Sequence, residues 1–261
     1  MRTPPMPSLF LSHGAPTLAL DDSPAGRFLD TLAATLPRPR AIVVASAHFD
    51  TAGTTLACAA EFPTLHDFNG FAPALHAVRY PARGDATTAQ RARTLLAGAG
   101  IESTLDVRTG LDHGAWVPLL RMYPEADIPV VALSIDSARD AAWHFSLGRA
   151  LAPLRDDGVL VIGSGGFSHN LRELDWRGAR AGSPEWMRAF TEGLRARLLA
   201  GDVDGALDWS SLPDAARNHP SPEHLLPLFV ALGSAGDRAE ARWLHGSVEM
   251  GALALDAFAF G

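Results

Sequence analysis

The sequence predicts an α/β fold: a single domain of 261 residues whose central mixed β-sheet is flanked by helices on both faces. Two observations predict it. Apolar, β-branched runs at 41–45, 129–134 and 158–163 are typical of strands buried on both faces. Helix-length segments alternate with these runs, and such alternation favours a sheet covered on both sides. α/β chains of this length often form one domain, so we expect a single domain over 1–261.

Local signals set the expected elements in chain order. The first amphipathic segment ends at Pro37-Arg-Pro39, and the stretch 60–74 is rich in Pro, Gly, Asn and aromatic residues, which predicts a loop. Ser221 suits the N-cap of a late helix, and Pro222 suits its first position. The expected strands are 8–12, 41–45, 54–59, a short one from 101, 129–134, 158–163 and two closing strands within 241–258. The expected helices are 23–36, 86–99, 113–122, 139–155, 185–200 and 222–232.

Composition excludes several classes of function. The formal net charge is −7 and no cluster of Lys and Arg is present, so the chain lacks the basic surface that nucleic-acid binding needs. Cys58 is the single cysteine, which excludes an intrachain disulfide and a cysteine-rich zinc site. Its apolar neighbours predict a small buried thiol rather than a nucleophile.

The sequence also bears on location. The first residues, Met-Arg-Thr-Pro-Pro-Met-Pro, lack the apolar stretch of about 7–15 residues and the cleavage site of a signal peptide. No run approaches the roughly 18 continuous apolar residues of a membrane span. We therefore expect a cytoplasmic protein without a membrane partner, and no feature indicates an oligomeric state.

Three buried-type strands run through small residues to a histidine. These endings are Ser-Leu-Phe-Leu-Ser-His13, Val-Val-Ala-Ser-Ala-His48 and Leu-Val-Ile-Gly-Ser-Gly-Gly-Phe-Ser-His169. In open α/β sheets, ligands bind in the crevice beyond the carboxyl ends of the strands. Imidazole is the commonest metal-ligating side chain and titrates near neutral pH. The pattern therefore predicts a shared metal or acid/base site built by these three histidines.

The other histidines differ in what their surroundings predict. His224 falls in the first turn of the expected helix 222–232, and His113 follows a small-residue turn before an apolar helix. His219 suits a hydrogen-bonding loop residue, and His66 in the aromatic loop suits either substrate contact or a backbone hydrogen bond. The remaining three, in helix or strand patterns, are expected to be surface or half-buried residues: His76, His144 and His245.

Carboxylates leave a second kind of metal site open. Two histidines with one carboxylate would suit non-haem iron, and Glu223 adjoins His224. Glu223 is equally explained by its favourable interaction with a helix N-terminus. Asp50 and Asp67 could orient an imidazole from behind. Gly163-Ser-Gly-Gly lacks the rest of a nucleotide-binding motif and predicts a tight turn that lets backbone approach the site.

Seven motifs, in order along nearly the whole chain, resemble those of the 4,5-DOPA extradiol dioxygenase family, within the class III (LigB-type) ring-cleaving dioxygenases. They are Ser-His13-Gly-Ala-Pro, Ser-Ala-His48-Phe, Asp67-Phe-Asn-Gly70-Phe, Arg79-Tyr-Pro-Ala-Arg-Gly84, Leu-Asp-His113-Gly-Ala-Trp116, Gly165-Gly-Phe-Ser-His169-Asn and His219-Pro-Ser-Pro-Glu-His224. Asn69 and Ala72 stand where many members have Tyr and Pro, so the loop that borders the substrate pocket departs from the family.

The resemblance implies a mixed-sheet α/β fold and a mononuclear metal. It implies that His13, His48 and His224 are metal ligands, that His169 is a fourth ligand or an acid/base, and that His113 is an acid/base or orients the substrate. Substrate contacts are expected from His66, Asp67 and His219. Iron, Fe(II), is the expected catalytic metal, with zinc, Zn(II), able to occupy the same site, and the substrates would be a small catechol and O2. A zinc hydrolase and a non-enzymatic metal- or metabolite-binding relative are the alternatives.

Overall fold

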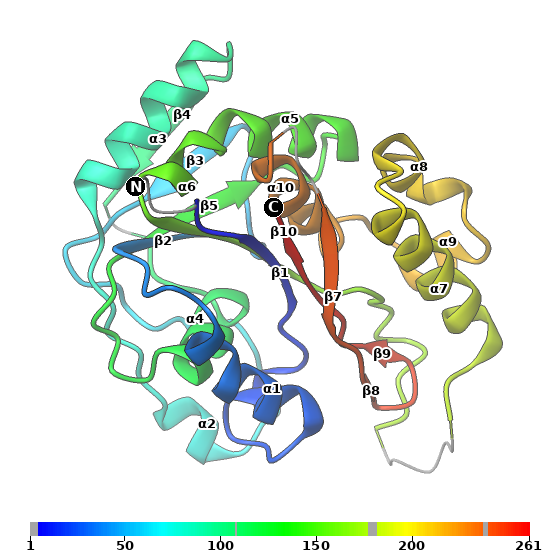
Figure 1. Cartoon of the computed structure of the whole chain (residues 1–261). Helices are drawn as coiled ribbons and strands as arrows, with labels where there is room; N and C mark the ends of the chain where they lie inside the picture. Colours follow the sequence, from blue (N-terminus) through cyan, green and yellow to red (C-terminus); the bar gives the residue numbers. More distant parts are fainter. Residues whose placement is uncertain (1–4, 108, 177–181, 237–239) are drawn as a thin grey trace.

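The structure is a computed structural model, described here for residues 5–107, 109–176, 182–236 and 240–261. Within these ranges, eight strands form one sheet and two more form a small hairpin (Figure 1). The sheet strands are β1 (Ser8–Ser12), β2 (Ala41–Asp50), β3 (Thr54–Ala57), β4 (Ser103–Asp106), β5 (Val130–Ile135), β6 (Val159–Gly165), β7 (Ala241–His245) and β10 (Ala257–Phe260). The hairpin strands are β8 (Val248–Glu249) and β9 (Leu253–Ala254).

Helices cover the sheet. The α-helices are α1 (Pro24–Leu32), α2 (Pro73–Ala77), α3 (Ala86–Gly98), α4 (His113–Met122), α5 (Ala141–Leu151), α6 (Pro153–Asp156), α7 (Glu185–Leu199), α8 (Val203–Leu207), α9 (Ala215–Asn218) and α10 (Leu226–Ser234). Short 3-10 helices are η1 (Pro16–Ala19), η2 (Ala33–Thr35) and η3 (Trp209–Ser211).

The sheet is mixed, as predicted. Its order is β4-β3-β5-β2-β6-β1-β10-β7. The four central strands β5, β2, β6 and β1 are parallel, with Val44 of β2 paired to Ala132 and to Ile162. On one side β3 runs antiparallel to β5, and on the other β10 runs antiparallel to β1. The carboxyl ends of β1, β2 and β6 therefore meet at one edge of the sheet.

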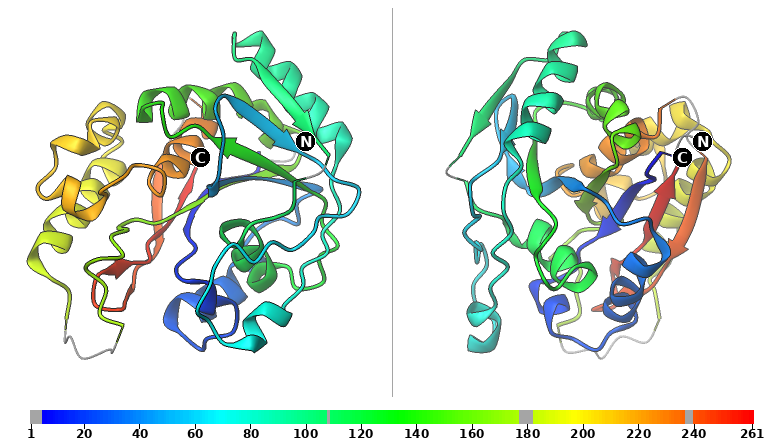
Figure 2. Two further views of the ribbon diagram at one scale, coloured as in Figure 1. Left: turned by 180° about the vertical axis from the view of Figure 1, so that it is seen from behind. Right: turned by 60° about the vertical axis from the view of Figure 1, so that its left-hand side comes forward.

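Side chains alternate between two buried faces. Leu11, Val44 and Ile162 pack in the cluster that includes α1 and α4, whereas Phe10 and Val43 pack in clusters that include α3, α5, α7 and α10. Successive residues of a strand point to opposite faces, so both faces of the central strands must be apolar. The two views of Figure 2 show α1 and α4 on one side of the sheet and α5 and α10 on the other.

Glycines bring α10 against its neighbours. A Cβ on Gly148 of α5 would lie 2.1 Å from the carbonyl oxygen of Val230, and one on Gly233 would lie 2.0 Å from that of Phe145. The two helices can therefore cross closely only because these positions carry no side chain. Gly163 on β6 works in the same way, since its Cβ would meet the carbonyl oxygen of Pro227 at 2.0 Å.

Several predicted boundaries were wrong. The late helix begins at Leu226 rather than 222, so His224 lies in the preceding turn and Ser221 contacts Glu223 instead of capping a helix. The helix expected over 139–155 is divided before Pro153, which lacks an N–H to continue it. The first helix ends in the 3-10 turn η2, and the closing region forms four short strands rather than two.

Three further points concern the cysteine, membrane spans and the N-terminus. Cys58 is buried and free. No helix in the described ranges combines the length and the apolar character needed to cross a membrane. The expectation of no leader sequence rests partly on residues 1–4, which lie outside the described residues.

His144 is completely buried, contrary to the expected surface or half-buried position. It faces inward from α5: its Nδ1–H donates to the carbonyl oxygen of Asp140 at 2.8 Å, and its Nε2 accepts the N–H of Asp136 at 3.3 Å. Burial lowers the pKa of His144 below its usual 6.5. The hydrogen bond that Nε2 accepts requires the neutral ring.

We expect this ring to make stability depend on pH. Because the folded pKa is lower than the unfolded one, the unfolded chain binds the extra proton, and stability falls as the pH drops below about 6.5. One such group contributes up to about 1.4 kcal/mol per pH unit. Denaturant unfolding of the wild type and of His144→Gln between pH 5 and 8 measures this, and the variant should show the shallower slope. Equal slopes would contradict the assignment.

Candidate metal centre and substrate cavity

The predicted strand-end histidines meet at the shared edge of the sheet. His13 directly follows β1, and its N–H donates to the carbonyl oxygen of Gly165 at the end of β6, at 3.0 Å. His48 lies within β2, close to its carboxyl end. His169 follows β6 by four residues. Because β6 lies between β1 and β2, these three histidines gather over neighbouring strand ends.

Two further histidines come from helix starts. His113 is the first residue of α4, whose N-cap Asp112 accepts the N–H of Ala115 at 3.1 Å. His224 lies in the turn before α10, and its carbonyl oxygen accepts the N–H of Gly166 at 2.8 Å. A Cβ on Gly165 would stand 2.0 Å from that same oxygen. The glycine therefore lets the His224 turn lie directly on the end of β6.

The imidazoles converge closely. Nε2 of His48 lies 3.2 Å from Nε2 of His13 and 3.3 Å from Nε2 of His224. The ring of His113 lies 4.0 Å from that of His48, between centroids. The ligand atoms of His13, His48 and His113 lie within 4.8 Å of one another, as do those of His169, Glu223 and His224.

Hydrogen bonds behind the rings define which nitrogen of two histidines is protonated. Ser164 Oγ donates its hydrogen to the carbonyl oxygen of Gly114 at 2.5 Å, so it accepts a hydrogen bond from Nδ1–H of His13 at 3.1 Å. Nδ1 of His224 faces a carboxylate oxygen of Glu223 at 3.1 Å and must donate to it. Their Nε2 atoms therefore carry lone pairs toward the centre.

Asp67 sets the protonated nitrogen of His48 and His113 through their Nδ1 atoms. One of its oxygens lies 2.9 Å from Nδ1 of His113 and 3.5 Å from Nδ1 of His48. Burial of Asp67 opposes ionisation, but hydrogen bonds from His113 outweigh it and lower the pKa of the carboxyl to about 2. The carboxylate is therefore charged at neutral pH and favours the Nδ1–H form of both rings.

This donor set fits a metal ion. The Nε2 atoms lie 3.2–3.3 Å apart with their lone pairs facing, so they cannot hydrogen-bond to one another. Their spacing matches the distance of about 3.3 Å between two nitrogen ligands of a tetrahedral metal with bonds of 2.0–2.1 Å. Burial lowers the pKa of His48 to about 3 and the pKa values of His13 and His224 well below 6.5. These rings are neutral at pH 7, as metal ligation requires.

A cavity of about 800 Å³ opens above the histidines. Its polar floor carries His13, His48, His113, His169 and His224. Its apolar lining consists of Phe68, Phe71, Leu171, Leu174, Trp176, Met250 and Leu253, together with small residues after His13. The β8–β9 turn places Met250 there with a positive φ of 47°, and the carbonyl oxygen of Met250 accepts the N–H of Asp175 at 2.8 Å.

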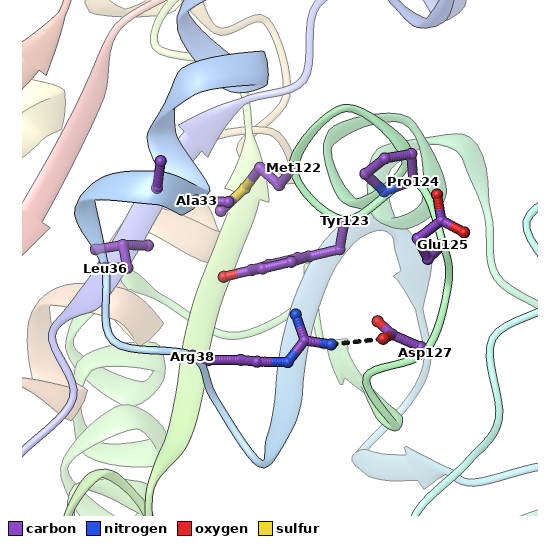
Figure 3. Close-up of a pocket in the computed structure, with 9 residues that line it drawn as sticks. Ala33, Leu36, Arg38, Met122, Tyr123, Pro124, Glu125 and Asp127 are labelled. Atoms are coloured by element: carbon purple, nitrogen blue, oxygen red, sulfur yellow. Dashed lines mark hydrogen bonds and ion pairs between the residues drawn. The ribbon is translucent and has the colours of Figure 1, made fainter.

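A smaller hollow of about 250 Å³ lies at the opposite end of α4 (Figure 3). It is lined by residues such as Tyr123 and by the ion pair of Arg38 with Asp127 at 2.6 Å. None of its lining residues is a histidine or cysteine, and one of its two carboxylates is paired. The lining of this hollow therefore lacks the imidazole groups that characterise the histidine cavity.

The family described as "Catalytic LigB subunit of aromatic ring-opening dioxygenase" matches residues 7–253. The chain belongs to the LigB family.

Named relatives and a solved structure are similar to this LigB chain over nearly its full length. A protein of Escherichia coli (strain K12) named 4,5-DOPA dioxygenase extradiol is 44% identical, covering 96% of this chain and 93% of its own length. One of the same name from Beta vulgaris is 40% identical, covering 97% and 96%. The crystal structure of an uncharacterized protein from Escherichia coli K12 superposes with a TM-score of 0.84 at 39% identity, covering 98% and 100%. The predicted family and fold are confirmed.

Two predicted substrate contacts do not line the LigB cavity. Nε2 of His66 contacts the carbonyl oxygen of Val78 at 3.1 Å. His219 is buried, with Nε2 on the carbonyl oxygen of Phe167 at 3.2 Å, and burial lowers the pKa of His219 to about 4. Both rings contact backbone, the alternative that their loops also suggested. Asp67 does line the cavity.

The sequence analysis suggested one carboxylate that is not in the site and missed several residues that are. Asp50, the other carboxylate that the sequence suggested, does not line the cavity, and its carboxylate accepts the N–H of Ser137 at 2.9 Å. Ser164, which orients His13, lies at the end of an apolar run, where no motif distinguishes it from a structural serine. The only sequence signal near Met250 is the Met250-Gly251 pair, which is compatible with a turn between two short strands. The apolar wall joins the segments 68–71, 171–176 and 250–253, which no local pattern of the sequence links.

Proposed function

We propose that the protein is a metal-dependent extradiol dioxygenase that inserts O2 into a substituted catechol and yields a muconate semialdehyde-type product. The observation that carries this proposal is the set of converging histidine Nε2 atoms at the floor of an apolar cavity in a LigB-family chain. The names of the relatives support a catechol with a side chain, such as DOPA.

We assign His13, His48 and His224 as the metal ligands. Their Nε2 spacings of 3.2 and 3.3 Å support this set over one containing His113. Iron(II) bound there would supply a Lewis acid that chelates the catechol oxygens and places dioxygen beside the ring. Zinc binds all-nitrogen sites more tightly than iron(II), so zinc in the isolated protein would not argue against iron as the working metal.

We assign His169 to proton transfer rather than ligation. Its ring stacks on that of His224 with centroids 3.4 Å apart and an interplanar angle of 7°. Because the two ring planes are parallel and offset, His169 does not aim a nitrogen lone pair at the point that Nε2 of His224 faces, so His224 rather than His169 would hold the metal. His169 lines the cavity, where it would face a catechol hydroxyl.

The cavity walls would hold the ring. Phe68 and Phe71 lie on the loop that follows Asp67, while Leu174 and Trp176 lie after His169. Flat apolar surfaces exclude water and pack against an aromatic substrate. His113 and His169 would then accept the proton of a catechol hydroxyl and return it when the ring opens.

Oxygen uptake tests the function. The protein is reconstituted anaerobically with iron(II), then mixed in air with L-DOPA, caffeate or protocatechuate while oxygen and visible absorbance are followed. We expect one O2 consumed per catechol and a yellow semialdehyde. No uptake with any of these catechols by the iron-loaded protein, with zinc retained after isolation, would favour a zinc hydrolase or a binding protein instead.

We expect His169→Ala to keep its metal and lose about 10²–10⁴-fold in kcat, the usual contribution of general acid/base catalysis. Metal content by elemental analysis and oxygen uptake are measured on the same preparation. His66→Gln serves as the control, since His66 lies outside the cavity lining, and it should retain both properties. If metal content fell in step with activity, His169 would instead be a ligand.

A further inference from the structure

Asp67 contacts two histidines of the site at once. Its Oδ1 accepts the backbone N–H of His113 at 2.9 Å, and its Oδ2 accepts Nδ1–H of the same residue at 2.9 Å. Oδ2 also lies 3.5 Å from Nδ1 of His48. Oδ1 is therefore bound to the backbone at the start of α4 and Oδ2 to the rear of the imidazoles, although Asp67 comes from a loop distant in sequence.

The loop holds Asp67 in place. Trp116 Nε1 donates to the carbonyl oxygen of Leu65 at 2.8 Å, and the N–H of Leu65 donates to the carbonyl oxygen of Leu111, also at 2.8 Å. Phe68 is buried and packs edge-on against the ring of His113, with centroids 5.7 Å apart. The loop is thereby attached to α4 and the turn before it through the backbone of Leu65 on one side of Asp67 and the side chain of Phe68 on the other.

The start of α4 suits a carboxylate. The first N–H groups of a helix have no partner within the helix, and the helix dipole favours negative charge there. The neighbouring Asp112 makes different contacts: its Oδ1 accepts hydrogen bonds from Ser46 Oγ at 2.5 Å and from the N–H of Ala115 at 3.1 Å. Within the described residues, the His113 ring thus has Asp67 as its carboxylate partner.

We propose that Asp67 is the positioning residue that holds His113 with a proton on Nδ1 and a bare Nε2 toward the cavity, and that it links this ring to the ligand His48. The catalytic part of the proposal rests on the proposed function. On substrate binding, the O–H bond of one catechol hydroxyl breaks, its proton forms an N–H bond at Nε2 of His113, and the electron pair stays on oxygen. The resulting imidazolium lies against the Asp67 carboxylate, as in other histidine–carboxylate pairs.

The variant Asp67→Asn separates this role from simple packing. The amide keeps the shape and one acceptor oxygen, which can still take the His113 N–H. Its NH2 group then faces Nδ1 of His113 and forces the proton to Nε2, where the acceptor is lost. We expect kcat to fall about 10²-fold or more, with KM within about threefold of wild type, because the ring remains but its protonated nitrogen has changed.

A readout independent of activity comes from ¹⁵N-histidine NMR of the full-length chain, both metal-free and zinc-loaded. We expect His113 as the Nδ1–H form in the wild type and as the Nε2–H form in Asp67→Asn. The matched control is Asp140→Asn, which removes the N-cap carboxylate of α5 away from the cavity and should leave the His113 tautomer and kcat unchanged. A wild-type His113 protonated on Nε2 would overturn the proposal even if no variant folded.

A double-mutant cycle with His113→Ala completes the test. If Asp67 acts through His113, Asp67→Asn should lower kcat less than about threefold in the His113→Ala background. Equal losses in both backgrounds would overturn the proposal. Absence of catechol turnover by the wild type would refute the proposed function alone, since the NMR result still decides how Asp67 sets the tautomer.

Discussion

Replacing His48 by alanine should leave a folded protein that retains no metal and consumes no oxygen with catechol. Nε2 of His48 lies 3.2 Å from Nε2 of His13 and 3.3 Å from Nε2 of His224, so it is the shared neighbour in the proposed ligand set. Its loss leaves two ligands, too few for a stable mononuclear site. We expect metal content to fall from about one ion per chain to background, measured by elemental analysis after dialysis against iron(II) or zinc.

The control is His245→Ala. His245 is half-buried, stacks on Phe28 with centroids 4.7 Å apart and contacts Ser247 Oγ, outside the cavity lining. This variant should bind metal like the wild type. Full metal content in His48→Ala would show that the metal lies elsewhere among the clustered histidines. His224→Ala then tests the other cluster, His169, Glu223 and His224, because that cluster does not contain His48 and should lose its metal in this variant.

Gly165→Ala should have the second-largest effect, although it removes no functional group. Its Cβ would lie 2.0 Å from the carbonyl oxygen of His224, closer than any real contact. The His224 turn must move away from β6, which breaks the Gly166 hydrogen bond to the same oxygen and withdraws the His224 ring. We expect metal affinity to fall at least tenfold and the free energy of unfolding to fall by about 3 kcal/mol.

Gly98→Ala is the matched control. Gly98 ends α3, and a Cβ there meets nothing within 4 Å. This change should stabilise the protein by up to about 1 kcal/mol and leave metal binding unchanged. Urea unfolding and metal titration of both variants make the comparison. Wild-type metal affinity in Gly165→Ala would mean that the His224 turn does not depend on close approach to the sheet.

The sequence identified most of the histidine cluster because of strand geometry. Apolar β-branched runs predict buried strands, and parallel neighbours present their carboxyl ends at one edge, so His13, His48 and His169 had to approach each other. His224 was assigned through the family resemblance, although its helix was placed too early. Pro222 suits a first helical position, but the chain first makes a turn against Gly165 and begins α10 at Leu226.

Local pattern and composition were thus sufficient for the α/β class, the mixed sheet and the histidines at its edge. They named Asp67 and Asp50 as carboxylates that could orient an imidazole but could not choose between them, and they could not predict that Ser164 would orient His13 or that His144 would be fully buried. The contact of Asp67 with His113 joins residues 46 apart in sequence, and the contact of Ser164 with His13 joins residues 151 apart. The periodicity of a segment reports which side it buries, whereas only the packed chain determines which distant group that side meets.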